Sequence, residues 1–269
     1  MLKFISFSSG SSGNCYYLGY NDKNGKHRGL LIDAGVSLRR VRAGLENNGL
    51  SYDDFNGILL THDHMDHIRN VGSYCKKLNK PVYATSILHT ALSHHTAAMP
   101  HILSCRKILE ESVWNDIDGF LVKYFIVPHD ATQTVGYAIK TEGHLFVLMT
   151  DMGRMTDEAI SYALAADTVV IESNYDIDML MAGPYTYDLK MRICKGNGHL
   201  SNDECAASIK RFWHKGLKNI FLCHLSENNN TPEKAYQSAL MALLELGVEK
   251  GTVNLQSLPR RNPSSLFNL

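Results

Sequence analysis

The sequence predicts an α/β fold in which sheets are flanked by helices within one compact domain. Short apolar runs rich in β-branched residues recur along the 269 residues, and helical patterns lie between several of them. Hairpins early in the chain, followed by strand–helix alternation, are typical of sheets covered by helices. A hydrophobic fraction of 44% with 20% charged residues excludes a disordered chain.

The predicted strands are short apolar runs, each closed by a polar turn, which favours strands over helices. They cover residues 29–33, 57–61, 120–127, 134–140, 145–150, 168–172 and 219–223. Polar segments at 21–25 and 140–144 predict hairpin turns between neighbouring strands.

Helical patterns occupy segments between the strands, at 38–48, 67–78, 157–165, 206–214 and 233–246. Thr231 followed by Pro232 predicts an N-cap with proline at the first helical position. Ser201 with Glu204 three residues later predicts a capping box. The sequence contains no repeat or linker, so residues 1–258 are expected to form a single hydrolase domain. The polar residues 259–269 are expected to form a loosely held C-terminal tail.

Cysteine content and hydropathy bear on the cellular compartment. The six cysteines form no C-x-x-C pair, and the first residues lack the apolar core of a signal peptide. No apolar run approaches the length of about 18 residues that a membrane span needs. We therefore expect a soluble cytoplasmic protein with buried free thiols and no membrane association.

Charge composition limits how the protein can bind a polyanion. The 27 Lys and Arg residues balance 27 Asp and Glu residues, so the formal net charge is zero. This excludes a protein that grips nucleic acid with an overall basic surface. A polyanionic substrate would have to be held by local charge, such as bound metal ions. The 13 histidines supply candidate metal ligands.

A loop rich in metal-ligating residues directly follows the predicted strand 57–61. It contains His62, His64, Asp66 and His67. Imidazole and carboxylate groups suit zinc, manganese or iron. His62 and His64 can face one ion, whereas Asp66 and His67 begin a new turn and can face another. The alternative, a polar loop with hydrogen-bonded histidines, is disfavoured by the number of ligand types gathered after one buried strand.

Four residues cannot complete two metal sites, and further candidate ligands follow other predicted strands. His129, Asp151 and His224 each lie at or just beyond the end of such a strand. Polar residues immediately beyond apolar strands are where α/β proteins build their sites. Each of these residues alone would be an ordinary strand-end residue, but the shared pattern indicates a site.

The His-x-His-x-Asp-His loop, with downstream His, Asp and His at strand ends, resembles the metallo-β-lactamase fold superfamily. The resemblance implies an αββα sandwich with a dinuclear site for two divalent ions, zinc or manganese, with iron as a further option. It also implies a ligand set, in which His62, His64 and His129 hold one ion, Asp66, His67 and His224 hold the second, and Asp151 bridges them. Asp33 matches an early aspartate of the family that supports the ligand loop.

Two further residues favour phosphodiester hydrolysis. Glu172 ends a predicted strand, and His199 lies in a Gly-His-Leu-Ser stretch before a capped helix. A carboxylate beside an imidazole raises its basicity and fixes its tautomer, so His199 is expected to protonate a departing sugar oxygen with Glu172 as its partner. This stretch resembles the phosphodiesterase branch of the superfamily. The competing interpretation is that His199 is a surface residue of the capping region.

The likeness extends over nearly the whole chain to the YycJ/WalJ-like group of that superfamily, bacterial cytoplasmic proteins associated with 5′-to-3′ exonuclease activity on DNA. It rests on Ser-Ser-Gly-Asn near the start, Thr-His-Asp-His-Met-Asp-His, Glu-Ser-Asn and Gly-His-Leu-Ser-Asn. Tyr175 departs from the group, which is expected to have His there. Loops at these motifs and a local basic cluster supply candidate phosphate contacts, namely Ser12, Asn14, Asn174, Ser226, Asn228, Lys190, Arg192 and Lys195.

These observations predict a dinuclear metal-dependent phosphodiesterase, a 5′-to-3′ DNA exonuclease of repair or processing, with metal-activated hydroxide as the nucleophile. His199, Glu172 and Asp66 are the expected catalytic residues, and DNA is favoured over RNA as the substrate. The same fold also suits hydrolysis of a small ester, thioester or cyclic phosphodiester. A metal-stabilised regulatory protein is a third interpretation, which the intact ligand set disfavours. The sequence predicts no particular protein partner.

Overall fold

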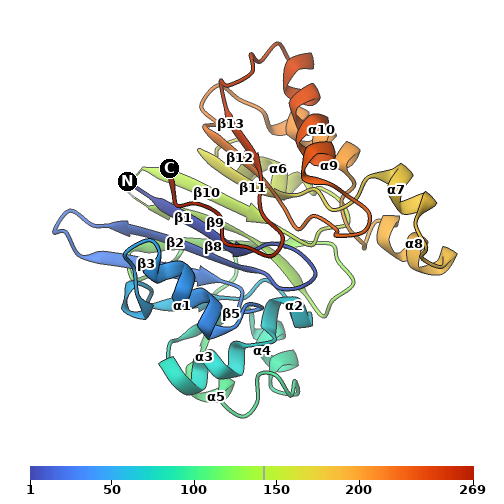
Figure 1. The fold of residues 1–269 in the computed structure, drawn as a ribbon. Coiled ribbons are helices and arrows are strands. Elements are labelled where there is room, and N and C mark those ends of the chain that lie inside the picture. Colours follow the sequence, from blue (N-terminus) through green and yellow to red (C-terminus); the bar gives the residue numbers. More distant parts are fainter. Residues whose placement is uncertain (142) are drawn as a thin grey trace. The chain divides into compact units, whose positions relative to one another are not determined.

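The computed structural model describes residues 1–141 and 143–269. The chain folds into two compact units (Figure 1). Unit 1 comprises Met1–Lys123, Ala131–Gln133 and Arg261–Leu269, and unit 2 comprises Tyr124–Asp130 and Thr134–Arg260. No helix among the described residues has both the length and the apolar character that crossing a membrane requires.

Unit 1 is built on a sheet with the strand order β14-β1-β2-β3-β4-β5-β6. Its strands are β1 (Lys3–Ser8), β2 (Cys15–Asn21), β3 (His27–Ile32), β4 (Gly57–Leu59), β5 (Val82–Ala84), β6 (Arg106–Ile108) and β14 (Phe267–Asn268). The strands β1, β2 and β3 pair antiparallel through hairpins, and β3, β4, β5 and β6 pair parallel. The hairpin predicted at 21–25 is thereby confirmed, because it joins β2 to β3.

Helices cover one side of this sheet, as Figure 1 shows for α1, α3, α4 and α5. They are α1 (Leu38–Glu46), α2 (Met65–Ile68), α3 (Val71–Leu78), α4 (Ser86–Leu92) and α5 (Ile102–Cys105), with a 3₁₀ turn at Tyr52–Asp54. Apolar side chains of the strands and helices form one core, in which Tyr17 and Leu31 from the sheet join Leu45 and Tyr74 from the helices. Burial of this apolar face, more than helix propensity, stabilises helices as short as these.

Unit 2 is built on the sheet whose strand order is β13-β12-β11-β10-β9-β8-β7. The strands are β7 (Asn115–Ile117), β8 (Phe120–Val127), β9 (Thr134–Thr141), β10 (His144–Met149), β11 (Thr168–Glu172), β12 (Asn219–Cys223) and β13 (Asn254–Ser257). By chain position, β7 and the first residues of β8 belong to unit 1. The strands from β10 to β13 pair parallel, so their carboxyl ends lie at one edge of the sheet.

The helices of unit 2 are α6 (Asp157–Ala163), α7 (Ile177–Ala182), α8 (Tyr187–Cys194), α9 (Asn202–Phe212) and α10 (Pro232–Glu245). The helix α9 packs against both α6 and α10, and α10 also packs on β13. The short helices α7 and α8 extend away from these (Figure 1).

Most predicted elements are confirmed, three strands of unit 2 with the predicted bounds. Thr231 caps α10 with Pro232 in its first turn, and Ser201 and Glu204 form the capping box of α9. The helix predicted at 67–78 is wrong as one element, because α2 and α3 are separate. Asn70 stands between them, and its backbone amide donates to the Ala34 carbonyl at 3.0 Å instead of to the Asp66 carbonyl, which accepts from the Asn14 amide. The hairpin predicted at 140–144 includes Glu142, which lies outside the described residues, although Thr141 pairs with His144.

The C-terminal segment is not loosely held as its polar composition suggested. β14 pairs antiparallel with β1, and Phe267 stacks on Phe4 with ring centroids 6.1 Å apart. The Ser264 amide donates to the Ser6 carbonyl at 2.8 Å, and the Ser6 amide donates to the Ser264 hydroxyl at 3.0 Å. Phe267 and these backbone hydrogen bonds therefore anchor a segment that polar composition alone would leave free.

Candidate active site

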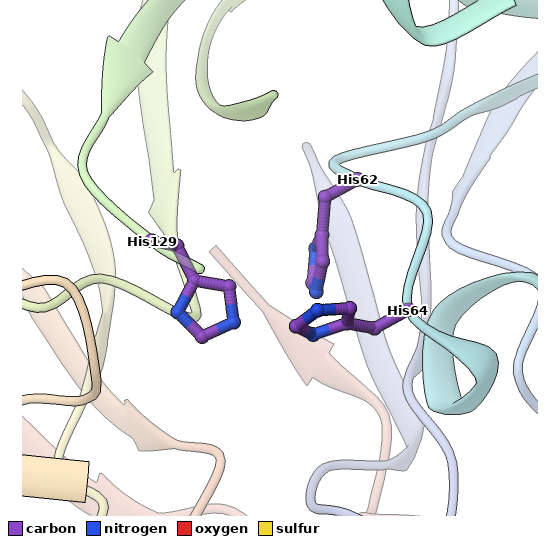
Figure 2. A group of neighbouring side chains, drawn as sticks. All are labelled: His62, His64 and His129. Atoms are coloured by element: carbon purple, nitrogen blue, oxygen red, sulfur yellow. The ribbon is translucent and has the colours of Figure 1, made fainter. Parts of the chain in front are cut away.

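The predicted ligand loop of unit 1 lies between the end of β4 and the start of α2. Figure 2 shows His62 and His64 side by side on this loop, and it also draws His129, which follows β8. The ring centroids of His62 and His64 are 4.7 Å apart, and those of His62 and His67 are 4.1 Å apart. The Asp66 carboxylate lies 3.5 Å from Nε2 of His67. The loop therefore gathers its predicted ligands into one cluster.

Asp33 holds this loop in place from the end of β3. Its Oδ2 lies 2.7 Å from Nδ1 of His67, and its Oδ1 accepts from the backbone amide of Thr61 at 2.9 Å. The Thr61 hydroxyl donates to the same carboxylate. Asp33, Thr61 and His67 are all fully buried, so these hydrogen bonds are not exchanged with water.

Asn14, a predicted phosphate contact, is fully buried against the ligand loop. Its backbone amide donates to the Asp66 carbonyl at 2.7 Å, and its side-chain amide lies 3.1 Å from Oδ2 of Asp66 and 2.8 Å from Nε2 of His67. Ser12, the other candidate of this turn, is exposed. Asn14 therefore positions the ligand loop, whereas Ser12 remains accessible to a substrate.

The loop also requires a glycine at position 35. A Cβ at Gly35 would overlap the Asp66 carbonyl oxygen and crowd the Asn14 amide. We expect Gly35→Ala to lower the free energy of unfolding by about 1–3 kcal/mol, the usual cost of overpacking, and to weaken metal binding. Thermal unfolding and metal titration measure both. Gly216→Ala is the control, because its Cβ would meet only the His214 ring, no closer than 3.1 Å. A melting temperature and metal affinity equal to wild type would refute the steric argument.

In unit 2 the parallel strands bring predicted site residues to one edge. Asp151, Glu172, His199 and His224 place their ligand-type atoms within 4.8 Å of one another. Nδ1 of His224 lies 3.0 Å from Oε1 of Glu172 and 3.3 Å from Oδ1 of Asp151. Glu172 ends β11, and His224 directly follows β12, so the sheet itself sets these distances.

Three predicted site residues adopt left-handed backbone conformations. The φ angles are 64° at Asp33, 51° at Asp151 and 52° at His224. Asp and His adopt this region more readily than most residues, but it remains uncommon for any residue with a Cβ. Such conformations concentrate at functional sites, where the surrounding structure holds them. In each case the turn comes within two residues of a strand end.

Glu172 and His199 form a charged, hydrogen-bonded pair in unit 2. Nδ1 of His199 lies 2.7 Å from Oε1 of Glu172, and the other carboxylate oxygen accepts from the backbone amides of Met152 and Leu200. Burial alone would raise the pKa of Glu172, but the charge and hydrogen bond of His199 outweigh it and lower that pKa.

The same interaction raises the pKa of His199. Burial lowers the pKa of His199, but the Glu172 carboxylate raises it above the ordinary value overall. The His199 side chain is 22% exposed, whereas Glu172 is fully buried. The buried carboxylate thus stabilises the protonated imidazole while part of the His199 side chain stays accessible, which suits a general acid.

His129 joins this group from the end of β8. Its Nδ1 lies 2.8 Å from the Gly198 carbonyl oxygen, and its Nε2 lies 3.8 Å from Oδ1 of Asp151. Burial lowers the pKa of His129, so the neutral imidazole that a metal requires is favoured. The Gly153 amide donates to the Pro128 carbonyl at 2.7 Å and ties this loop to the loop after β10.

Three further predicted substrate contacts, Asn174, Ser226 and Asn228, also lie in unit 2, and they differ in burial and in hydrogen-bond partners. The Asn174 side chain donates to the His224 carbonyl at 2.8 Å, so it orients the strand end that carries His224. The Ser226 amide donates to the Asn174 carbonyl, and Asn228 is exposed with its amide 3.0 Å from the Tyr185 hydroxyl. Tyr175, where the group was expected to have His, is buried, and burial raises the pKa of its phenol.

The three basic residues predicted to contact phosphate differ in their hydrogen-bond partners. Nζ of Lys190 donates to the Met181 carbonyl at 2.6 Å, which directs it toward the end of α7. Arg192 pairs with Asp130, the residue after His129, and Lys195 lies on the loop that leads to His199.

Sequence reasoning missed groups that carry no ligand chemistry of their own. Thr61 and the Gly198 carbonyl hold ligand candidates in place, and Gly35 allows the loop to approach. The only sequence signal for Thr61 is its position between the strand and the first histidine. A backbone carbonyl has no sequence signal.

The imidazoles fit a divalent metal ion. Nδ1 of His67 faces a carboxylate and Nδ1 of His129 faces a carbonyl, and both groups only accept hydrogen bonds. The hydrogen therefore resides on Nδ1 and Nε2 carries the lone pair, which in His67 accepts from the Asn14 side-chain amide at 2.8 Å and would turn to a metal when one binds. Histidine ligands of metal sites typically make this kind of hydrogen bond through the second nitrogen. In unit 1 the Asp66 carboxylate, and in unit 2 the Asp151 carboxylate, adds an oxygen donor of the kind that divalent metals accept.

Comparison with known proteins agrees with these features. The family described as beta-lactamase superfamily domain matches residues 28–217. Exodeoxyribonuclease YycJ of Bacillus anthracis is 34% identical over 254 residues, which cover 93% of this chain and 92% of that protein. Exodeoxyribonuclease WalJ of Streptococcus pneumoniae serotype 2 (strain D39) is also 34% identical over 254 residues, covering 91% of this chain and 90% of that protein.

A solved structure extends the comparison to the fold. The metallo-beta-lactamase fold protein YhfI from Bacillus subtilis matches with a TM-score of 0.70 at 15% identity, covering 98% of each chain. The predicted fold class is therefore confirmed.

Proposed function

The chain belongs to the metallo-β-lactamase superfamily and is a metal-dependent hydrolase, and we propose that it is an exonuclease that cleaves DNA from the 5′ end. The observation that carries the proposal is the His199–Glu172 pair beside Asp151 and His224. It occurs in a chain related over nearly its whole length to proteins named exodeoxyribonucleases. The sugar oxygen that departs from a phosphodiester needs an acid, whereas the thiolate that departs from a thioester does not.

We propose that the protein holds a dinuclear metal site with the ligand set that the family resemblance implies. One divalent ion would be held by His62, His64 and His129, and the second by Asp66, His67 and His224, with Asp151 bridging. The donor set admits manganese or zinc, and also iron. When bound, two such ions lower the pKa of a water molecule and neutralise charge on the attacked phosphate. Asp66, next to His67, also belongs to the catalytic set as the carboxylate at the second ion.

The protein's own residues then handle the leaving group. Nδ1–H of His199 donates to Glu172, so protonated His199 presents its Nε2–H to the substrate. We propose that this proton passes to the sugar oxygen as the P–O bond breaks. Glu172 stays ionised throughout and keeps the imidazole oriented, since its lowered pKa disfavours taking up a proton. DNA repair or processing in the cytoplasm would provide such substrates.

A panel of substrates tests this proposal. Purified protein is incubated with 5′- and 3′-labelled DNA, single- and double-stranded, with matching RNA, and with small ester and thioester substrates. Each is run with Mn²⁺, Zn²⁺ or chelator. We expect mononucleotides released from the 5′ end of DNA, slower cleavage of RNA, and no cleavage in chelator. Rapid turnover of a small ester with none of any oligonucleotide would overturn the proposal.

A further inference from the structure

A hollow of about 370 Å³ opens in unit 2 beside the candidate site. Its lining residues carry charged or polar side chains, with one glycine, and come from the loop after β8, the loop after β10, and α8 with the loop that follows it: Asp130, Arg154, Arg192, Lys195, Gly196 and Asn197. None of these lining residues is aromatic or aliphatic, so the apolar surface of the hollow comes from side-chain stems and backbone, and not from the kind of wall that holds a nucleobase.

The hollow is directly connected to the candidate site along the chain. Asp130 follows His129, Arg154 is three residues after Asp151, and Asn197 is two residues before His199. The three loops also contact one another. A Cβ at Gly153 would overlap the backbone of Gly196 and Asn197, so glycine at this position allows two of the loops to meet.

The charges of the hollow favour an anion. Three cationic side chains face one carboxylate, and that carboxylate, Asp130, pairs with Arg192. Among the described residues, Arg154 and Lys195 have no carboxylate partner, and both are exposed. Cations without partners around a small polar hollow attract an anion, and the planar guanidinium of arginine matches phosphate with two parallel hydrogen bonds.

We propose that this hollow is a subsite for one phosphate group of the substrate strand, distinct from the phosphate that is cleaved. Arg154, Arg192 and Lys195 bind it, and Asp130 orients the Arg192 guanidinium. Lys190 is not part of this subsite, since its ammonium is directed to Met181. The inference rests on the proposed function, because it assigns the hollow a nucleic-acid phosphate as its ligand. That phosphate is either the 5′-terminal group or a neighbouring phosphodiester.

The test is a triple variant, Arg154→Gln, Arg192→Gln and Lys195→Gln, assayed on two substrates. DNA can occupy both the cleavage site and the hollow, whereas bis(4-nitrophenyl) phosphate has a single phosphate and reports only on the cleavage site. We expect KM for DNA to rise about 10-fold or more, as expected when hydrogen bonds to a charged group are lost. Turnover of the small diester should fall by much less than turnover of DNA, because this substrate does not reach the hollow. The slope of log affinity against log salt should become shallower by about one, the value for one phosphate contact.

Matched controls separate this effect from a general loss of positive charge. Arg211 is an exposed arginine paired with Asp157 in the same unit, as Arg192 is with Asp130, and Lys250 is an exposed lysine. The double variant Arg211→Gln, Lys250→Gln should keep the wild-type KM for DNA. An equal rise of KM in the control and the triple variant would overturn the subsite.

Two further substrates identify the phosphate. If the subsite binds the 5′-terminal group, wild type prefers 5′-phosphorylated over 5′-hydroxyl DNA and the triple variant loses that preference. If it binds an internal phosphodiester, one uncharged methylphosphonate linkage next to the cleaved bond raises KM for wild type but not for the triple variant. A triple variant that matches wild type in KM and salt slope refutes the subsite, even though DNA is cleaved. Absence of DNA cleavage by wild type refutes the proposed function instead.

Discussion

The His199→Ala variant should cleave DNA about 10²–10⁴-fold more slowly than wild type, the range that general acid catalysis contributes. Its metal content should be unchanged, because His199 is proposed to protonate the sugar oxygen and not to hold a metal ion. Rates on labelled DNA and metal analysis of the purified variant measure the two quantities. His94→Ala is the control, since His94 is exposed on a turn of unit 1. A wild-type rate for His199→Ala would remove His199 from the mechanism.

The Glu172→Gln variant gives the same assignment a pH signature. Glu172 raises the pKa of His199, and the acid must be protonated to act. Activity of wild type should therefore fall as pH rises through the pKa of His199. Removing the carboxylate lowers that pKa, so the alkaline limb of the pH–rate profile should move to lower pH. A purely structural role for Glu172 would reduce the rate without moving the limb.

The Asp151→Asn variant should lose metal and, with it, hydrolysis of every substrate. Asparagine retains the size of the side chain and tolerates the left-handed conformation at this position, so the fold should persist. Because Asp151 is the proposed bridging ligand, the loss should exceed the about 10–100-fold that follows removal of a residue that only orients a ligand. Metal analysis and thermal unfolding are run in parallel. Asp157→Asn, at an exposed carboxylate, should behave as wild type.

Wild-type metal content and activity in Asp151→Asn would refute the bridging assignment. Loss of activity with full metal content would leave Asp151 as a residue acting on the substrate, which also contradicts that assignment.

The strands and caps were predictable because their signals are local. The run 168–172 is apolar up to Glu172, and β11 ends at that residue. The Ser201–Glu204 capping box fixes where α9 begins, four residues before the predicted start of that helix at 206. By contrast, the interruption between α2 and α3 depends on a tertiary hydrogen bond from the Asn70 backbone amide to the Ala34 carbonyl, which no local pattern encodes.

The candidate site likewise has residues that the sequence pattern locates and contacts that only tertiary packing determines. The ligand types stand at strand ends, where sequence pattern locates them, and the structure gathers Asp151, Glu172, His199 and His224 in unit 2. The burial of Asn14 against Asp66 and His67 could not be predicted, because it depends on how the first turn packs on the ligand loop. From the sequence alone, a short polar turn is equally consistent with a surface loop that contacts substrate.

The hollow shows how local charge can act in a neutral protein. Arg154 and Arg192 are far apart in sequence, and they line one wall because the loop after β10 packs on the loop before His199. The zero net charge therefore excludes an overall basic surface but not a single cationic subsite. Recognition of a polyanion at one small place, next to bound cations, is the mode that this charge distribution supports.

The most direct test of the proposed function is DNA cleavage by one preparation before and after metal removal. The protein is stripped with chelator, its metal content is measured, and 5′-labelled DNA is supplied before and after Mn²⁺ or Zn²⁺ is restored. We predict no cleavage by the stripped protein, and recovery of 5′-end cleavage as about two metal ions bind per chain. Cleavage by metal-free protein, or fully metal-loaded protein that leaves DNA intact, would contradict the proposal.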